Sequence, residues 1–144
     1  MKKILGLTLL LPFLSVNAKM IHADVNITHI TPIKEDAVWT RKKQVSPKYP
    51  MKLAKSGIAG CGIFKVVVNE QGETESVELI SSIPKKVIFK PSRKVIKKWK
   101  WAKADNTIAK AEEKTIRLDY CMGGTSLEEA QQRCQSQAKL SCSV

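Results

Sequence analysis

The feature that most constrains how this chain can fold is a set of four cysteines, Cys61, Cys121, Cys134 and Cys142. An even number of cysteines in a chain of 144 residues is typical of a small disulfide-linked domain, if the protein reaches an oxidising compartment. A metal site is disfavoured, because no Cys-x-x-Cys pair is present and neither His22 nor His29 lies near a cysteine. We therefore expect disulfides, and neither a metal nor a cofactor.

The first 18 residues have the pattern of an export signal. Lys2 and Lys3 precede an almost wholly apolar run from Ile4 to Val16, and Ala18 supplies the small residue before a cleavage point. The alternative is an uncleaved membrane anchor, but a spanning helix needs about 20 apolar residues and this run is shorter. We predict cleavage after Ala18 and a mature protein without a transmembrane anchor.

The chain is strongly basic, with a net charge of +12. Such a charge could indicate nucleic acid, an anionic membrane surface or an acidic partner. Nucleic acid is disfavoured, because an exported protein rarely meets it and no basic surface interleaved with aromatic residues is visible. We interpret the charge as a solvated basic face. Part of it complements the dipole at the carboxyl end of a predicted helix, at Lys97, Lys98, Lys100 and Lys103.

Hydrophobic periodicity and turn residues predict a compact order of elements. An N-terminal arm, partly ordered, contains a strand pattern over residues 24–30. The elements expected after it are a short helix at 50–56, strands at 61–68 and 73–81 joined by a turn at Gly72, a helix at 90–101, a strand at 112–122, and a last helix with a capping box at Ser126 and Glu129.

This order predicts an α+β fold. The hairpin makes the strands at 61–68 (strand one) and 73–81 (strand two) antiparallel. A right-handed crossover through the helix at 90–101 then brings the strand at 112–122 (strand three) antiparallel beside strand one. The result is a three-stranded antiparallel or mixed sheet of order 2-1-3, with two helices on one face and an added C-terminal helix. Strand three is then an exposed edge. The predicted division is a signal peptide at 1–18, an arm at 19–45, a core domain at 46–122, and a disulfide-linked helix and tail at 123–144.

The predicted sheet favours one disulfide pairing. Cys61 opens strand one and Cys121 closes strand three, and such ends meet in adjacent antiparallel strands at a separation within disulfide range. The remaining pair, Cys134 with Cys142, requires the last helix to end near Lys139, because eight helical residues span about 12 Å. The two other connectivities, which link the tail to the sheet, stay open.

A series of short motifs follows the predicted elements in order: Tyr49-Pro50, Ala54, Gly57 and Gly60, then Phe64 to Gly72, Val77 to Ser82, and Phe89 with Trp99-Lys100-Trp101. With these motifs, residues 46–121 resemble the C-terminal domain of the TonB energy-transducer family, whose fold has two helices on one face of a three-stranded sheet. Transducers of that family also have an uncleaved anchor and a long Pro-rich spacer, which are not visible here, so we do not expect transduction by this chain alone.

The resemblance implies a periplasmic protein-binding module for TonB-dependent transport. In the family, the edge of the third strand accepts an extended segment of an outer-membrane receptor by strand addition. Arg117 and Asp119 point away from the predicted buried face and are candidates for partner selection. The edge that corresponds here consists of Lys114, Thr115, Ile116, Arg117, Leu118, Asp119 and Tyr120.

Two other classes of function are alternatives for this sequence. One is a structural or accessory periplasmic protein, in which the edge forms a homodimer or is blocked by the tail helix or by residues 24–30 as a fourth strand. The other is an enzyme, which is disfavoured because no nucleophile–base set and no Gly-rich phosphate loop is visible.

Overall fold

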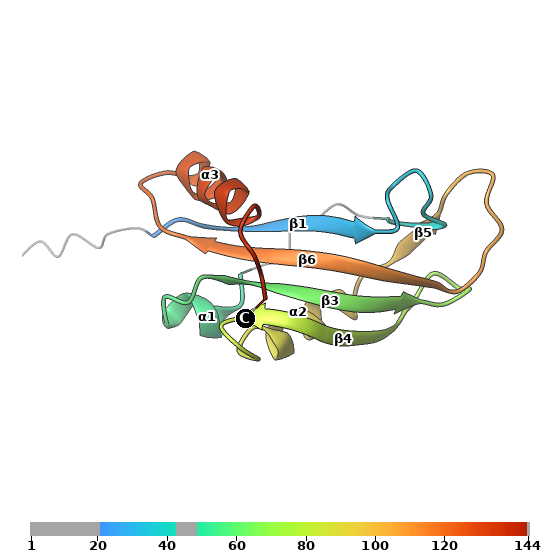
Figure 1. The fold of residues 1–144 in the computed structure, drawn as a ribbon, viewed down its shortest axis with the longest axis horizontal. Coiled ribbons are helices and arrows are strands. Elements are labelled where there is room, and N and C mark those ends of the chain that lie inside the picture. The colour runs from blue at the N-terminus through green and yellow to red at the C-terminus, as the bar shows by residue number, and fades with distance from the viewer. Residues whose placement is uncertain (1–20, 43–48, 144) are drawn as a thin grey trace, which may run out of the picture.

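The computed structural model describes residues 21–42 and 49–143 (Figure 1). The predicted signal peptide lies outside these residues, so its cleavage stays a prediction. The strands are β1 (Ala23–Thr31), β2 (Trp39–Arg41), β3 (Gly60–Val68), β4 (Thr74–Ile83), β5 (Trp101–Lys103) and β6 (Glu112–Met122). The helices are α1 (Met51–Lys55), α2 (Phe89–Ile96) and α3 (Leu127–Gln137).

The main sheet has four strands in the order β1-β6-β3-β4, and every neighbouring pair is antiparallel. The three predicted strands are β3, β4 and β6, and β3 lies between the other two. The prediction of a three-stranded sheet is therefore corrected to four strands. The added strand is β1, from the segment that was predicted as an arm.

Residues 37–41 of that arm also belong to the fold. β2 pairs with β5 in a separate two-stranded sheet, and the side chains of Val38 and Trp39 are buried. The helix predicted to reach Trp101 ends instead at Ile96. Trp101 begins β5, because its backbone N–H donates to the carbonyl of Gly72 and its indole Nε1 to the Thr74 hydroxyl. These tertiary contacts outweigh the local helical pattern.

The hydrophobic core lies on one face of the sheet. Alternation along β6 directs Ile116, Leu118 and Tyr120 to that face, where all three are fully buried. They pack in one cluster with residues of α1, α2, β3 and β4, including Leu53, Ile96, Phe64, Val66 and Val77. The core face is therefore the face that α1 and α2 cover.

Gly72 forms the tight β3–β4 turn that the sequence predicts. Its φ is +71°, a conformation that side chains disfavour, and the Asn69 carboxamide oxygen accepts hydrogen bonds from the N–H groups of Gln71 and Glu73. A Cβ at Gly72 would lie 2.8 Å from Cζ3 of Trp39. The turn therefore also supports the packing of the N-terminal segment.

The opposite face of the sheet carries α3, which lies over β1 and β6 (Figure 1). The helix begins as predicted, with the Ser126 hydroxyl accepting a 3.2 Å hydrogen bond from the N–H of Glu129. The Glu129 carboxylate accepts from the N–H of Thr125, instead of closing the capping box on Ser126. Ala130 and Cys134 are the buried residues of the helix.

Candidate functional site

β6 is paired on both sides. Its register with β3 runs from Gly60 opposite Tyr120 to Val68 opposite Glu112, and its register with β1 runs from Ala23 opposite Met122 to Thr31 opposite Thr115. The expectation of an exposed edge at β6 is therefore wrong for this structure. The alternative, in which residues 24–30 add a fourth strand, is the arrangement observed.

The seven predicted edge residues lie on two faces of β6. Ile116, Leu118 and Tyr120 belong to the core, and Lys114 on the same face is also buried. Thr115 is half-buried and faces Thr31 of β1. Arg117 and Asp119 point to the opposite face, as expected, but they are buried there as well.

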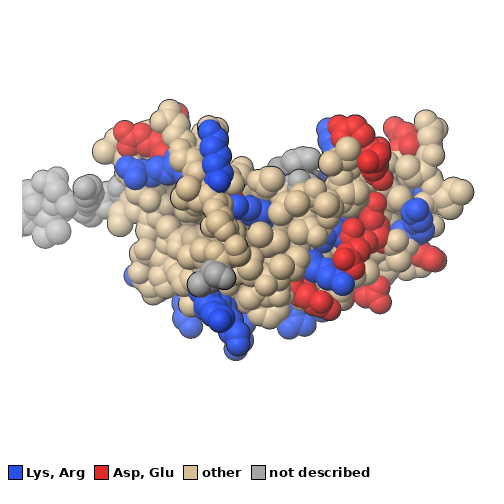
Figure 2. All heavy atoms as spheres, in the orientation of Figure 1, with Lys and Arg blue, Asp and Glu red and all other residues tan. Residues whose placement is uncertain are grey.

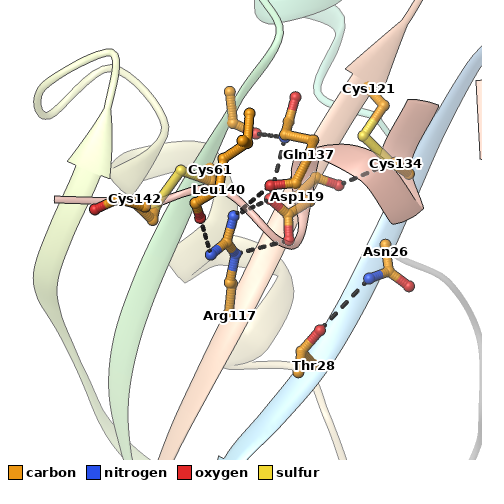
Figure 3. Close-up of polar contacts among 12 residues, drawn as sticks. Asn26, Thr28, Cys61, Arg117, Asp119, Cys121, Cys134, Gln137, Leu140 and Cys142 are labelled. Atoms are coloured by element: carbon orange, nitrogen blue, oxygen red, sulfur yellow. Dashed lines mark hydrogen bonds and ion pairs between the residues drawn. A yellow bond between two sulfur atoms is a disulfide. The ribbon is translucent and has the colours of Figure 1, made fainter.

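The Arg117 guanidinium and the Asp119 carboxylate form a bidentate ion pair (Figure 3). Nε donates to Oδ2 over 2.9 Å, and Nη2 donates to Oδ1 over 2.8 Å. Asp119 is fully buried, and the guanidinium replaces hydrogen bonds that water would otherwise provide to the carboxylate. The two side chains are therefore not available to select a partner, and that expectation is corrected.

The same guanidinium holds the C-terminal segment. Arg117 Nη1 donates to the carbonyl of Leu140 over 2.7 Å, and Nη2 donates to the carbonyl of Gln137 over 2.9 Å (Figure 3). Gln137 Nε2 donates in turn to the Gly60 carbonyl and to Asp119 Oδ1. The guanidinium thus supplies hydrogen-bond donors to carbonyl oxygens at the C-terminal end of α3, where carbonyls have no partner within the helix. Sequence reasoning missed Gln137 and Leu140, since backbone acceptors leave no side-chain pattern.

The disulfides are Cys61–Cys142 and Cys121–Cys134, with Cα separations of 5.8 and 5.2 Å. The favoured pairing of Cys61 with Cys121 is therefore wrong, and one of the two alternatives is present. The reason is register: Cys61 faces Asp119, two residues before Cys121, so the two strand ends are offset. Each sheet cysteine is instead linked to the C-terminal segment, one to α3 and one to the tail.

β1 is held differently at its two ends. Near its start, Val25 is buried, and Cys134 Sγ lies 3.6 Å from the carbonyl oxygen of Asp24. Near its end, Thr28, Ile30 and Thr31 are exposed. The strand is thus anchored under α3 and open to solvent at the end that faces Thr115 of β6.

Charged and aromatic residues pack around the start of β6, at Glu112. Glu112 accepts hydrogen bonds from the N–H groups of Val38 and Trp39, and it forms a 2.7 Å ion pair with Lys114. Burial alone would raise the pKa of Glu112, but these hydrogen bonds and the charge of Lys114 outweigh burial and lower it. The Lys114 ammonium also lies 5.5 Å from the centroid of the Trp101 ring. This cluster fixes β2 to β6.

The part of the chain that the structure describes holds no group of three or more His, Cys, Asp or Glu side chains able to bind a metal ion. Among the same residues, no helix combines the length and apolar content needed to cross a membrane. The absence of enzymatic activity stays a prediction.

An antiparallel sheet with α1 and α2 on one face and α3 on the other, in which β1 pairs along the side of β6, defines a small α+β domain built around strand pairing. A family model described as Gram-negative bacterial TonB protein C-terminal matches residues 45–121, more than half of the chain. The chain therefore belongs to the TonB C-terminal domain family, in agreement with the resemblance seen in its sequence. No curated protein matches it.

Proposed function

We propose that this chain is a periplasmic protein-binding module of TonB-dependent transport, which captures an extended segment of an outer-membrane receptor by strand addition at β6. The observation that carries the proposal is the ladder between β1 and β6. It pairs eight residues of each strand, so the β6 edge accepts an extended strand along most of its length. An incoming segment would use the same backbone N–H and C=O groups.

In this proposal β1 occupies the edge until a receptor segment replaces it. Exchange is energetically accessible because the incoming strand restores the backbone hydrogen bonds that β1 gives up. Displacement begins at the exposed Thr31 end, since the Val25 end is buried. The measured affinity is the intrinsic affinity reduced by the fraction of molecules in which β1 has left the edge.

A second candidate function is an accessory periplasmic protein whose edge is permanently closed. The observation that favours it is the packing of α3 over both β1 and β6. In that case β1 is part of the fold and does not leave.

A disulfide lock distinguishes the two functions. Thr31 and Thr115 are opposed in the β1–β6 register and lie outside the core, so cysteines at both positions can be bridged. Extended peptides from the plug regions of outer-membrane receptors are titrated into the full chain and into the Thr31→Cys/Thr115→Cys variant, with Thr31→Ser/Thr115→Ser as control. Peptide mapping checks that the native disulfides are retained.

We expect the wild-type and serine variants to bind one of these peptides, and the locked variant to lose binding. If neither wild type nor the serine variant binds any receptor segment, the module has no receptor-binding role and the accessory function stands. Equal binding by the locked variant would show that the peptide uses another surface.

A further inference from the structure

β4 is a free edge on the other side of the sheet. It is the terminal strand of the order β1-β6-β3-β4, and its ten residues pair only with β3 among the strands that the structure describes. The backbone groups on its outer side are therefore open to a further strand. This edge is distinct from β6, and the proposed function does not use it.

A groove of about 1040 Å³ lies beside this edge, between β4 and α2. Val77 and Leu79 of β4 contribute apolar surface on one side, and Val87, Phe89 and Pro91 contribute it on the other. Val87 is 41% exposed, so part of this apolar surface is open to solvent. The groove thus combines an open strand edge with an apolar floor, as peptide-binding grooves do.

The charged residues that line the groove are almost all cations. One acidic side chain, Glu78, lines it, and that residue faces Lys65 in the β3–β4 register. In the view of Figure 2, Lys and Arg project along the lower rim, where α1 and α2 lie, while Asp and Glu gather toward the end that carries β2 and β5. The cations that line the groove are Lys52, Lys86, Lys90, Arg93 and Lys94.

We propose that the β4 edge and the α2 groove form a second interaction surface, which binds an extended peptide segment that carries both apolar and acidic residues on the side facing α2, since alternate side chains of a strand share one face. The strand edge supplies backbone pairing, the floor takes the apolar side chains, and the cations select for acidic ones. Part of the basic charge of the chain is then a recognition surface and not only a solvated face.

The shape of the surface favours a peptide over an anionic membrane. A bilayer presents a broad surface and supplies no backbone groups to pair with a strand. A groove along a strand edge fits a single extended chain, which rises about 3.3 Å per residue. Membrane binding is therefore an outcome of the test that would count against the proposal.

The test uses the full chain at about 0.15 M salt, where weak long-range attraction between exposed charges is screened. A fluorescent octapeptide with Val at positions 1 and 5, Glu at positions 3 and 7 and Thr at the positions between them is titrated and its anisotropy measured, beside the same peptide with every backbone amide N-methylated. N-methylation removes the donors for strand pairing and leaves the charge unchanged. Vesicles containing anionic phospholipid are tested in parallel by co-sedimentation.

Two charge-reversal pairs in and directly after α2 provide matched variants. Lys90 and Lys94 lie in α2 and line the groove, whereas Lys97 and Lys98 follow the helix, are also exposed and do not line it. Lys90→Glu/Lys94→Glu and Lys97→Glu/Lys98→Glu change the net charge by the same amount. Lys90 is near the amino end of α2, where an acidic residue suits the helix dipole, so the groove variant is expected to fold.

We expect the Lys90/Lys94 reversal to weaken peptide binding about ten-fold or more, and the Lys97/Lys98 reversal by about two-fold at most. N-methylation should also abolish binding, and the Thr31→Cys/Thr115→Cys lock at β6 should leave it unchanged. Equal loss in both reversal pairs, full binding of the N-methylated peptide, loss of binding in the locked variant, or binding of vesicles without binding of the peptide would each overturn the proposal.

Discussion

The guanidinium of Arg117 lies within 2.9 Å of both carboxylate oxygens of Asp119, and the C-terminal segment covers the pair. These residues are two positions apart on β6, so the strand alternation places them on one face. Because the same guanidinium also binds the carbonyls of Gln137 and Leu140, one ion pair joins the sheet to the end of α3.

Removal of the Arg117 side chain should therefore destabilise the fold strongly. In Arg117→Ala the Asp119 carboxylate is left buried without its cation, which typically costs about 3–5 kcal/mol. Urea unfolding with the disulfides intact measures the change. Lys65→Ala is the matched control, since it breaks an exposed ion pair with Glu113 on neighbouring strands and should have a much smaller effect. Similar losses in the two variants would contradict a structural role for the buried pair.

Alanine substitutions at two glycines with positive φ, Gly57 and Gly72, distinguish the cost of backbone strain from the cost of steric contact. At Gly57 a Cβ would meet no atom within 4 Å, whereas at Gly72 it would approach both the Trp39 ring and the Trp101 carbonyl oxygen. We expect Gly57→Ala to lower the free energy of unfolding by about 1 kcal/mol, from the backbone conformation alone. Gly72→Ala should cost about 1–3 kcal/mol more, because the packing of Trp39 must shift. Thermal or urea unfolding checks this, and equal losses would show that the Trp39 contact does not matter.

Both tyrosines of the chain should lose their phenol protons at a higher pH in the folded protein than in the unfolded chain. Burial raises the pKa of Tyr49 and of Tyr120 to about 12, and for Tyr120 a hydrogen bond with Ser92 opposes part of that rise. The unfolded chain releases these phenol protons near pH 10, so their contribution to stability is complete below pH 10 and is lost as pH rises toward 12.

Tyrosinate absorbance at about 295 nm measures these pKa values directly. We expect little absorbance change near pH 10 in the folded protein and a normal titration in the denatured protein. Tyr49→Phe should remove about half of the total change. A folded-state midpoint near pH 10 would show that the two rings are more accessible than the structure indicates.

Glu112 should make the free energy of unfolding depend on pH in the acid range. Its folded-state pKa lies below the ordinary 4.5, so the stability it contributes is present above pH 4.5 and is lost as pH falls through the lowered value. Glu112→Gln removes the charge that balances Lys114, and we expect lower stability at neutral pH with a weaker dependence between pH 5 and pH 3. Urea unfolding across this range checks both effects, and an unchanged pH dependence would contradict the assignment.

Local signals predicted much of the fold. The β-branched run of β3, the glycine of its turn and the Ser126 cap all depend on nearby residues, and the bounds predicted for β6 agree with the structure. The family was also visible from local signals, because its motifs lie in or next to α1, β3, β4 and α2.

The parts that could not be predicted depend on distant contacts. The sequence of β6 alternates as if one face were wet, but α3 and the tail cover that face around Arg117 and Asp119. The disulfides followed the register between β3 and β6, which a pattern within one strand does not reveal. Whether residues 24–30 would occupy the β6 edge also depended on packing under α3, so both alternatives were open.

The central claim is that a receptor segment takes the place of β1 on β6. Amide hydrogen exchange of residues 23–31 and 112–122, with and without a bound receptor peptide, tests it most directly. In the free protein, we expect the amides of both strands that pair in the β1–β6 ladder to be protected. On binding, those of β1 should lose protection while those of β6 keep it. If peptide binds and β1 stays protected, strand exchange at β6 does not occur and the account is wrong.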